Sequence, residues 1–253
     1  MMNSNTGKRK LSAIEHFFLH LHPKKIDSRA IQFNRTFGLG GIIALLFVIL
    51  VITGLIMARG IYNFNHTRVH AFQVKVPAQS SGLDKLKIAV AADIHLSGIT
   101  RKDFVDQFVN RMKGTGADII LLGGDIVESS RETAKMKYFE DRFRELKAPY
   151  GVFAVEGNHE NYGRSEDYDF FAQAGIRLLR DSVVRFEEAF YLAGRKDRHE
   201  QQRQSISGLL QHASDSLPVM MMDHQPYELE KAAGNSIDLQ FSGHTHHGQL
   251  WPL

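Results

Sequence analysis

The chain has 253 residues, of which 43% are hydrophobic and 23% are charged, so its composition is that of a folded globular protein and not of a disordered one. It contains no cysteine, which excludes disulfide bonds, thiolate metal sites and cysteine nucleophiles. Residues 1–36 carry seven Lys or Arg against two acidic residues, whereas the rest of the chain has a net charge of −2. The larger part therefore lacks the basic excess that nucleic-acid binding requires, and we expect no nucleic-acid partner.

An uncharged stretch of 22 residues, 37–58, follows this basic arm. A helix rises about 1.5 Å per residue, so the stretch would span ~33 Å, enough to cross the hydrocarbon core of a bilayer. A buried core helix is the alternative, but soluble helices rarely stay apolar on every face for so long. A cleaved signal peptide fits less well, because its apolar run is usually only ~7–15 residues. The sequence therefore predicts one transmembrane helix at residues 37–58.

The charges that flank this segment predict its direction. Seven basic residues precede it, and only Arg59, Arg68 and Lys75 occur in the next 25 residues. Because basic flanks favour the cytoplasmic side, residues 1–36 are expected to be a cytoplasmic arm. We therefore expect a single-pass protein of the cell membrane, with a linker at residues 59–85 and an extracytoplasmic domain at residues 86–253.

Short apolar runs and amphipathic stretches alternate from residue 86 onward. Two helical faces are predicted, one formed by Phe104, Phe108 and Met112 and the other by Phe139, Phe143 and Leu146. This alternation favours an α/β layered domain. Around residues 176–197 strands follow one another without a helix, which predicts a mixed sheet, and the polar stretch 195–204 is expected to be a solvated loop and helix start. The predicted strands that precede polar motifs are residues 86–92, 119–122, 152–155, 219–222 and 237–241.

Each of these strands is followed by a short motif rich in metal-ligating side chains. Singly the motifs are weak signals, because polar turns often follow strands. Together, in order and at strand ends, they favour one shared metal site at the edge of a sheet. The motifs are Asp93-Ile94-His95, Gly123-Gly124-Asp125, Gly157-Asn158-His159-Glu160, Asp223-His224 and Gly243-His244-Thr245-His246.

The residue types in these motifs indicate the chemistry. His244 and His246 are alternate residues of an extended segment, so both imidazoles can face one cavity. Nitrogen and oxygen ligands without sulfur suit Mn²⁺, Fe or Zn²⁺. Two such ions about 3.5–4 Å apart activate a water molecule and clamp phosphate oxygens. The sequence has no Gly-rich phosphate loop followed by Lys and no serine in a nucleophile-elbow context, which disfavours ATP-driven and serine-hydrolase chemistry.

In this order the motifs resemble those of the calcineurin-like metallophosphoesterase family, over roughly residues 86–250. The segment Lys-Ile-Ala-Val-Ala-Ala-Asp-Ile-His at residues 87–95 is similar to a membrane-tethered bacterial branch, in which an apolar helix precedes the domain. The resemblance implies a four-layer α/β/β/α sandwich with mixed sheets and a site for two divalent metal ions. It implies that one ion is held by Asp93, His95, Asp125 and His246, and that Asp125 bridges to a second ion held also by Asn158, His224 and His244.

His159 directly follows the implied ligand Asn158, where it could protonate the departing oxygen as a general acid. Glu160 has two alternative interpretations, orientation of His159 or a solvated role. Glu128 departs from the family pattern, which often has Asp or Asn at that position. The family domain normally continues for several strands beyond His246, so the C-terminal strands are expected to be missing from this chain.

The sequence therefore predicts a membrane-anchored, dinuclear metal-dependent phosphoesterase. Its substrate would be a phosphoester or pyrophosphate, either a phosphorylated small molecule or a lipid-linked phosphate of the membrane or envelope. One alternative is a diphosphatase of the UDP-2,3-diacylglucosamine type in lipid A synthesis, whose cytoplasmic substrate conflicts with the predicted orientation. A second alternative is a non-catalytic scaffold with the same fold, which is less favoured because competent residues occupy every ligand position.

Overall fold

The structure is a computed structural model that describes residues 38–76, 81–128, 133–162, 168–213 and 216–246. The chain divides into two compact units, Met1–His66 and Thr67–Leu253. The predicted basic arm at residues 1–36 lies outside the described residues, as do residues 247–253. All eight predicted site residues lie within the described part of the second unit.

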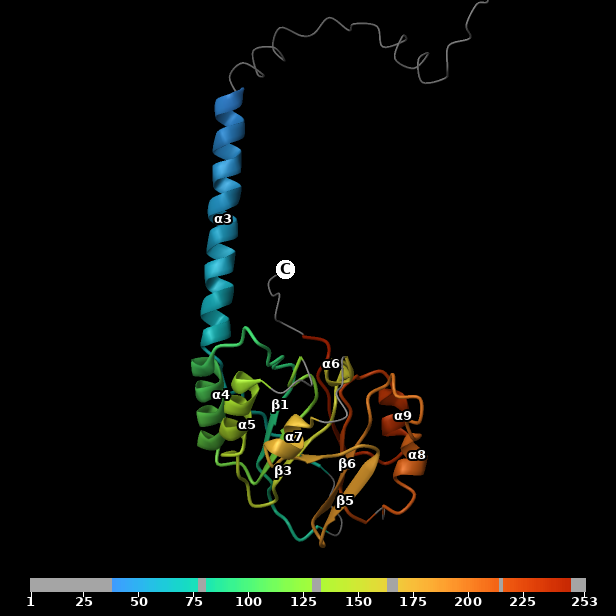
Figure 1. Cartoon of the computed structure of the whole chain (residues 1–253). Coiled ribbons are helices and arrows are strands. Elements are labelled where there is room, and N and C mark those ends of the chain that lie inside the picture. Colours follow the sequence, from blue (N-terminus) through green and yellow to red (C-terminus); the bar gives the residue numbers. More distant parts are fainter. Residues whose placement is uncertain (1–37, 77–80, 129–132, 163–167, 214–215, 247–253) are drawn as a thin grey trace, which may run out of the picture. The chain divides into compact units, whose positions relative to one another are not determined.

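The first unit contains one long apolar helix, α3 (Leu39–Asn65), of 27 residues (Figure 1). Large apolar side chains such as Leu45, Phe47 and Leu50 are exposed along it, and consecutive exposed positions cover every face. Within the described residues, Gly40–Asn65 is the one stretch of helix long and apolar enough to cross a membrane. The helix continues beyond residue 58, so the first part of the predicted linker is helical.

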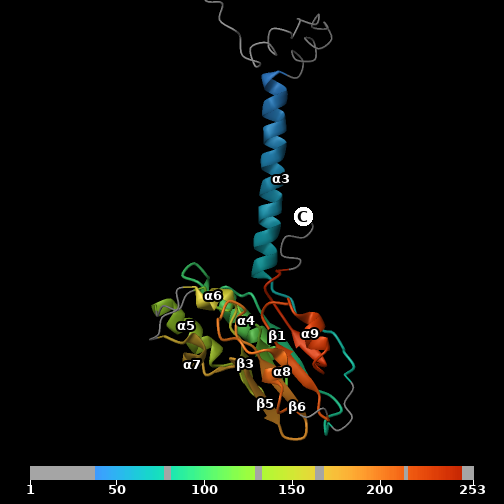
Figure 2. The same cartoon turned by 90° about the vertical axis from the view of Figure 1, so that its right-hand side faces the viewer.

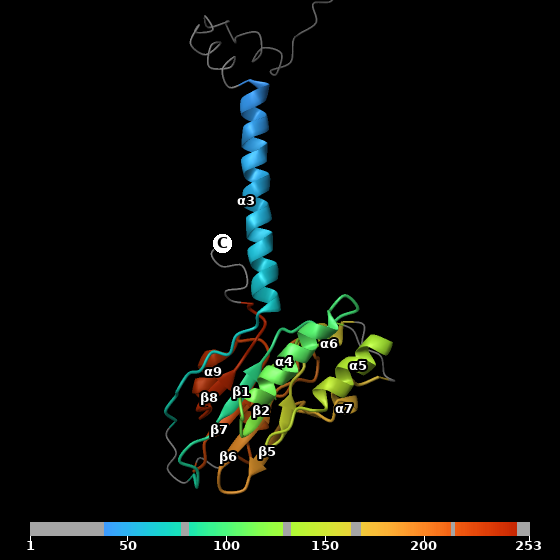
Figure 3. The same ribbon diagram turned by 90° about the vertical axis from the view of Figure 1, so that its left-hand side faces the viewer.

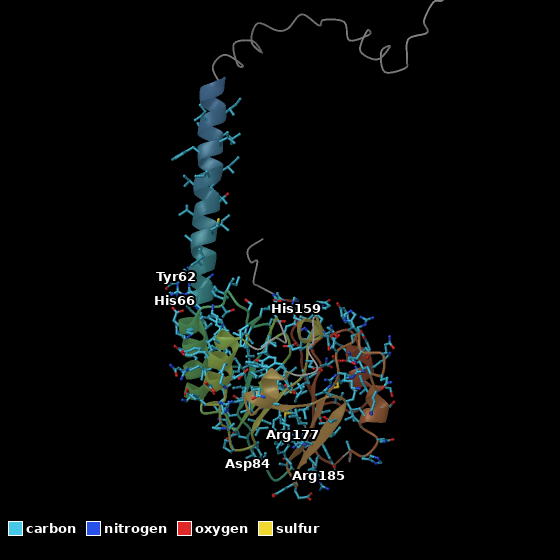
Figure 4. All side chains as sticks on the ribbon, viewed as in Figure 1. Tyr62, His66, Asp84, His159, Arg177 and Arg185 are labelled. Carbon is cyan, nitrogen blue, oxygen red and sulfur yellow. The ribbon has the colours of Figure 1, made fainter. Side chains whose placement is uncertain are left out.

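Side chains close the C-terminal end of α3. The Asn65 amide donates to the carbonyl oxygen of Ile61 at 2.9 Å, and His66 Nδ1 lies 2.7 Å from the carbonyl oxygen of Tyr62. The rings of Tyr62 and His66 stack with centroids 4.0 Å apart (Figure 4). These contacts add side-chain hydrogen bonds to carbonyl groups close to the C-terminal end of the helix.

The first sheet of the second unit contains four parallel strands in the order β1-β2-β3-β4. The connections between consecutive strands carry α4 after β1, α5 after β2, and α6 and α7 after β3. Figure 3 shows α4 and α5 in front of this sheet. The bounds are β1 (Ile88–Ala91), α4 (Lys102–Gly114), β2 (Ile119–Leu122), α5 (Ala134–Phe143), β3 (Val152–Ala154), α6 (Asn158–Asn161), α7 (Phe170–Gln173) and β4 (Arg177–Leu178).

The second sheet has the order β5-β6-β7-β8 and is mixed. An antiparallel pair, β5 and β6, forms one side, and β7 and β8 continue it in parallel with β6. The prediction of a mixed sheet is therefore confirmed here, whereas the first sheet is wholly parallel. Two short helices, α8 and α9, lie in front of this sheet in Figure 2. The bounds are β5 (Ser182–Phe186), β6 (Phe190–Gly194), α8 (Ile206–Leu209), β7 (Val219–Met222), α9 (Leu229–Ala233) and β8 (Leu239–Phe241).

The two sheets pack face to face between two layers of helices, which confirms the α/β/β/α prediction. In β2, Ile120 and Leu122 belong to the core under α4, α5 and α7, whereas Ile119 and Leu121 belong to the core between the sheets. In β7, Met222 faces the core between the sheets and Met221 faces α8 and α9. Strands covered on both faces are apolar at consecutive positions, which is why these runs do not alternate with polar residues.

One prediction about a polar segment is only partly right: the segment is a loop, and Arg198, His199, Gln201, Gln202 and Gln204 in it are exposed. Residues 195–204 were expected to form a solvated loop and helix start, yet Arg195 is only 3% exposed and Asp197 only 1%. The helix that follows, α8, begins later, where the Ser205 side chain accepts the N–H of Gly208 as an N-cap. Charge alone suggested solvation, but Arg195 is buried with Asp223 and Glu228, which lie about 30 positions later in the chain, whereas Asp197 is buried with a local contact to His199.

Candidate metal centre

The predicted site residues meet at the C-terminal ends of strands in both sheets. Parallel strands end at the same edge of a sheet, and the backbone ladder continues past the strands: the N–H of His95 donates to the carbonyl oxygen of Asp125, and that of Gly243 to His224. The order along the chain is Asp93 and His95 after β1, Asp125 after β2, Asn158 and His159 at the start of α6 after β3, His224 after β7, and His244 and His246 after β8.

Five of the predicted ligands have a left-handed backbone. Their φ angles are 56° for Asp93, 54° for His95, 51° for Asp125, 70° for His244 and 46° for His246. They are five of the eight non-glycine residues with positive φ in the described part of the chain. Such conformations cost about 1–3 kcal/mol each and gather at functional sites. The backbone is thus bent away from regular strand geometry at the positions where the motifs require convergence.

The first group of potential ligands contains Asp93, His95, Asp125 and His246, whose ligand atoms all lie within 4.8 Å of one another. The Nε2 atoms of His95 and His246 face each other at 3.1 Å. His246 Nε2 lies 3.5 Å from Asp93 Oδ1, and His95 Nε2 lies 3.9 Å from Asp125 Oδ2. Ligand atoms bound at ~2.1 Å to one cation are about 3 Å apart or more, so this spacing fits a metal ion.

The second group contains Asp125, His224 and His244. His224 Nδ1 donates to the carbonyl oxygen of Gly123 at 2.8 Å, which leaves Nε2 as the ligand atom, 3.1 Å from Asp125 Oδ2. The hydroxyl of Tyr227 lies 3.3 Å from His244 Nε2, which leaves Nδ1 of that ring for a metal. Asp125 belongs to both groups, so the two groups share one carboxylate.

Two buried polar atoms show that these residues fit a cation. Asn158 Oδ1 and His224 Nε2 are buried and have no hydrogen-bond partner among the described residues. Although His224 Nε2 and Asp125 Oδ2 are close, they do not have the geometry of a hydrogen bond. Buried polar atoms without partners are costly, and a divalent cation would satisfy an amide oxygen and an imidazole nitrogen together.

Electrostatics around Asp125 favour its ionised form. Burial raises the pKa of Asp125, but His224 and the backbone N–H of His159, which donates to Oδ1 at 2.8 Å, outweigh burial and hold this pKa below its ordinary value. Burial lowers the pKa of His224, and the Asp125 carboxylate more than offsets it, so this pKa is raised. Because ligands must be deprotonated to bind, a cation would displace the proton from the His224 ring.

Glu160 has a role that neither sequence interpretation anticipated. Its side chain is buried and accepts four backbone N–H groups, from Gly157, Asp125, Ile126 and Val127, at 2.6–3.1 Å. The pKa of Glu160 is raised to about 7, because the effect of burial exceeds the opposing effect of the backbone N–H donors. The carboxylate therefore joins the loop after β2 to the loop after β3.

Glu128 connects two histidines through one carboxylate. Oε1 accepts from His95 Nδ1 at 2.6 Å, and Oε2 accepts from His159 Nδ1 at 2.9 Å. These three residues also form a third potential ligand group, but hydrogen bonds of this length account for their proximity. A partner at Nδ1 fixes the tautomer and orientation of each ring and leaves Nε2 available for a metal in His95 and for a proton in His159.

The motif Asp223-His224 divides its roles between ligand and support. Asp223 is 2% exposed, and its Oδ2 is bound by Arg195 at 3.0 Å and also by Arg203. Arg195 binds Glu228 as well, at 2.7 Å. Burial raises the pKa of Asp223, and the two arginines oppose this shift. Removing one member of such a buried ion pair is strongly destabilising, so this network anchors the loop that carries His224.

Glycines in two motifs permit close packing of the loops. Gly124 has φ of 91°, and a Cβ placed there would lie 2.6 Å from His224 Nδ1 and 2.7 Å from the backbone nitrogen of Gly157. A side chain at Gly157 would collide with the carboxylate of Asp125. The loops after β2, β3 and β7 can therefore approach one another only because Gly124 and Gly157 have no side chain.

Comparisons with known proteins agree with this geometry. Residues 86–248 match the profile of the family described as calcineurin-like phosphoesterase. A metallophosphoesterase of Helicobacter pylori is 34% identical over 186 residues, which cover 71% of this chain and 50% of the relative. One from Aquifex aeolicus is 30% identical over 190 residues, covering 73% and 71%. A Danio rerio transmembrane protein with a metallophosphoesterase domain is 24% identical over 221 residues, covering 81% and 50%.

The matched region spans about half the length of the Helicobacter pylori and Danio rerio relatives. The profile nevertheless covers more than half of this chain, from the start of β1 to the last motif. The chain therefore belongs to the calcineurin-like phosphoesterase family.

Proposed function

We propose that this protein is a membrane-anchored phosphoesterase with a two-metal centre that hydrolyses a phosphoester or pyrophosphate bond. The observation that carries the proposal is the sharing of Asp125 between two ligand groups, one with Asp93, His95 and His246 and the other with His224 and His244. A carboxylate common to two groups is the feature that distinguishes a dinuclear site from a single-ion site. Asn158, whose buried Oδ1 has no other partner among the described residues, completes the second group.

Two divalent ions held there, Mn²⁺, Fe or Zn²⁺, would supply Lewis-acid activation of water and charge compensation for the phosphate. Asp93, Asp125 and Asn158 contribute oxygen and the four histidines contribute nitrogen, so the ligand set is hard to borderline. The bent backbone at five of these residues holds the donor atoms close before any ion binds. The protein thus supplies a preorganised set of ligands.

We assign His159 the role of proton donor to the leaving oxygen. Its Nδ1 is occupied by Glu128 and its backbone N–H by Asp125, so Nε2 is the position left for proton transfer. The ring lies 4.6 Å from that of the predicted ligand His95, between centroids, and is partly exposed. A general acid in this place contributes about 10²–10⁴-fold to the rate.

The apolar helix α3 supports a membrane location. A helix that is apolar on every face is not stable when it is exposed to water. Relatives of this chain are also described as transmembrane proteins. We propose a single span with residues 1–36 in the cytoplasm and the phosphoesterase unit outside it, because the basic residues precede the span. The substrate would then be a phosphorylated small molecule or a lipid-linked phosphate of the membrane or envelope, and not a nucleic acid.

The test uses the full chain purified in detergent, stripped with a chelator and titrated with Mn²⁺. We expect turnover of an aryl phosphodiester to depend on added metal and two ions to bind per chain by elemental analysis. Asp238→Asn is a matched control, because the contact of the Asp238 carboxylate among the described residues is with the N–H of Val219 at the start of β7, and it should behave as wild type. A metal-loaded chain that hydrolyses no phosphomonoester, phosphodiester or pyrophosphate would instead support the scaffold alternative.

A further inference from the structure

The loop after β6, which contains Arg198, is fixed beside the second group of predicted ligands by hydrogen bonds and an ion pair. Gln225, which directly follows His224 and is 2% exposed, accepts the backbone N–H of Arg198 through Oε1 at 3.1 Å. Within the loop, the buried carboxylate of Asp197 accepts the N–H of His199 at 3.0 Å. Glu200, further along the same loop, forms an ion pair with Arg180 at 3.0 Å. The position of Arg198 is therefore set by buried groups, although its own side chain is exposed.

The side chain of Arg198 lies at the margin of the metal centre. Its guanidinium carbon is 4.5 Å from the centre of the Tyr227 ring, and the hydroxyl of Tyr227 is 3.3 Å from His244 Nε2. Tyr227 is 56% exposed, so the stacked pair forms an accessible surface next to a predicted ligand. A guanidinium stacked on an aromatic ring keeps its N–H donors at its edges, where they can bind an anion.

The charge of Arg198 is not compensated in the way that neighbouring charges are. Arg195 and Arg203 pair with Asp223, and Arg180 pairs with Glu156 and Glu200. No carboxylate of the described residues forms an ion pair with Arg198. A preordered, unneutralised guanidinium beside the ligands is suited to bind an oxyanion by two parallel hydrogen bonds.

We infer that Arg198, supported by Tyr227, is a subsite for the second phosphate of a diphosphate diester substrate. The inference rests on the proposed function and deepens it by naming the substrate class. The metal ligands are placed to hold the phosphate that is attacked, so a cation beyond His244 serves an additional anionic group. In the hydrolysis, water oxygen bonds to the attacked phosphorus and a proton of that water passes to solvent. The bridging P–O bond breaks, and the bridging oxygen takes a proton from His159 and leaves with the second phosphate, which Arg198 binds.

The experiment compares two substrates on the Mn²⁺-loaded full chain in detergent. One is a symmetric dialkyl diphosphate, supplied as a soluble short-chain diester and as a long-chain diester in mixed micelles, and the other is bis(p-nitrophenyl) phosphate. For Arg198→Ala we expect kcat/KM on both diphosphates to fall about tenfold to a hundredfold, the value of a charge-assisted pair of hydrogen bonds. On the aryl diester it should stay within about twofold of wild type. Arg198→Lys keeps the charge but not the planar arrangement of N–H donors, so its kcat/KM on the diphosphates should lie between those of wild type and Arg198→Ala.

The matched control is Arg185→Ala. Arg185 is also exposed and also lies over a tyrosine, with 6.0 Å between its guanidinium carbon and the Tyr191 ring. Figure 4 shows it at the opposite end of the second unit from His159. This variant should hydrolyse both substrates like wild type. Equal loss on both substrates in Arg198→Ala, or no loss on either, would overturn the subsite.

A binding measurement separates failure of the subsite from failure of the proposed function. Calorimetry with a dialkyl methylenediphosphonate, which has no cleavable bridging oxygen, should give about tenfold or greater weakening in Arg198→Ala and none in Arg185→Ala. If wild type hydrolyses no phosphoester, the proposed function fails and this affinity difference alone decides the anion site. Equal affinities of wild type and Arg198→Ala would reject it.

Discussion

The backbone N–H of His244 donates to both carboxylate oxygens of Asp93, at 2.9 and 3.1 Å, although the two residues are 151 positions apart. Asp93 follows β1, the edge strand of the first sheet, and His244 follows β8, the edge strand of the second. A Cβ at Gly243 would lie 2.7 Å from Asp93 Oδ2, so glycine permits the approach. The first and last motifs therefore orient each other directly.

Asp125→Asn should lower the affinity of both metal ions. The substitution keeps the shape of the side chain but removes the negative charge shared by the two ligand groups. Metal content per chain, measured by elemental analysis after dialysis, is expected to fall well below two ions. The control Asp238→Asn makes the same chemical change outside the site and should retain full metal content. Two ions retained at normal affinity in Asp125→Asn would rule out the bridge.

His159→Asn should change the rate without changing metal content, since its side chain belongs to neither of the two groups that contain Asp125. Alkyl esters, whose leaving oxygen needs a proton, are expected to slow by about 10²–10⁴-fold. Esters of activated phenols leave as stable anions and should be affected much less. A plot of rate against leaving-group pKa tests this directly, and an equal loss across the series would contradict a proton donor.

Glu128→Gln should impair His95 and His159 together. The amide keeps one oxygen acceptor and replaces the other by an NH₂ group, which cannot accept the proton from a second Nδ1. Loss of such an orienting partner typically costs about 10–100-fold in activity or metal affinity. Glu145→Gln, a change to a surface carboxylate paired with Lys113, is the control. Wild-type kcat and metal affinity in Glu128→Gln would show that the bridging contact is dispensable.

Glu228 should make the domain sensitive to acid. Lys231 and Arg195 lower the pKa of Glu228 from 4.5 to about 2. Because the folded-state pKa is depressed, the stabilisation is complete above pH 4.5 and is lost as the pH falls toward 2. The difference in Tm between wild type and Glu228→Gln should therefore be largest near neutral pH and shrink steadily below pH 4.5. Glu230→Gln, on the exposed side of α9, should give no such pH-dependent difference, and a constant difference for Glu228→Gln would refute the assignment.

Reporter fusions after Val76 test the orientation of the membrane span. If residues 1–36 are cytoplasmic, a phosphatase that is active only outside the cytoplasm should be on and a fluorescent protein that matures only in the cytoplasm should be dark. Replacing the seven basic residues of the arm with neutral ones should weaken this pattern, because they are the source of the predicted bias. The opposite pattern would place the site in the cytoplasm and favour the UDP-lipid diphosphatase alternative.

Much of the fold was predictable because its signals are local. The runs that became β2, β3 and β7 are apolar at consecutive positions, and the faces around Phe104 and Phe139 have helical spacing. The loops after the strands carry the ligand types, so their convergence followed from the parallel arrangement. The end of α3 was less predictable, since the loss of apolar character after residue 58 does not by itself end a helix.

Contacts between distant segments could not be predicted from the sequence. Glu160 accepts one local N–H group, from Gly157 at the start of α6, but the other three come from residues more than 30 positions away, which its position in the sequence does not indicate. Arg195 appears in a polar run but pairs with Asp223, 28 positions later. The double role of Glu128 likewise depends on the positions of two histidines, one before it and one after it. Whether a charged side chain is buried depends on its interaction partners, and the positions of these partners in the sequence follow no local pattern.

The predicted ligands come from both sheets, so the distance between the sheets also sets the size of the candidate metal centre. Asp125 follows β2 and His224 follows β7, and the apolar layer that spaces these strands includes Leu121 and Met222. A substitution that thins or swells this layer would shift one half of the ligand set against the other. Changes such as Met222→Ala should therefore weaken metal binding. A screen of random mutants for lost activity should also find substitutions at interior positions that do not contact the substrate.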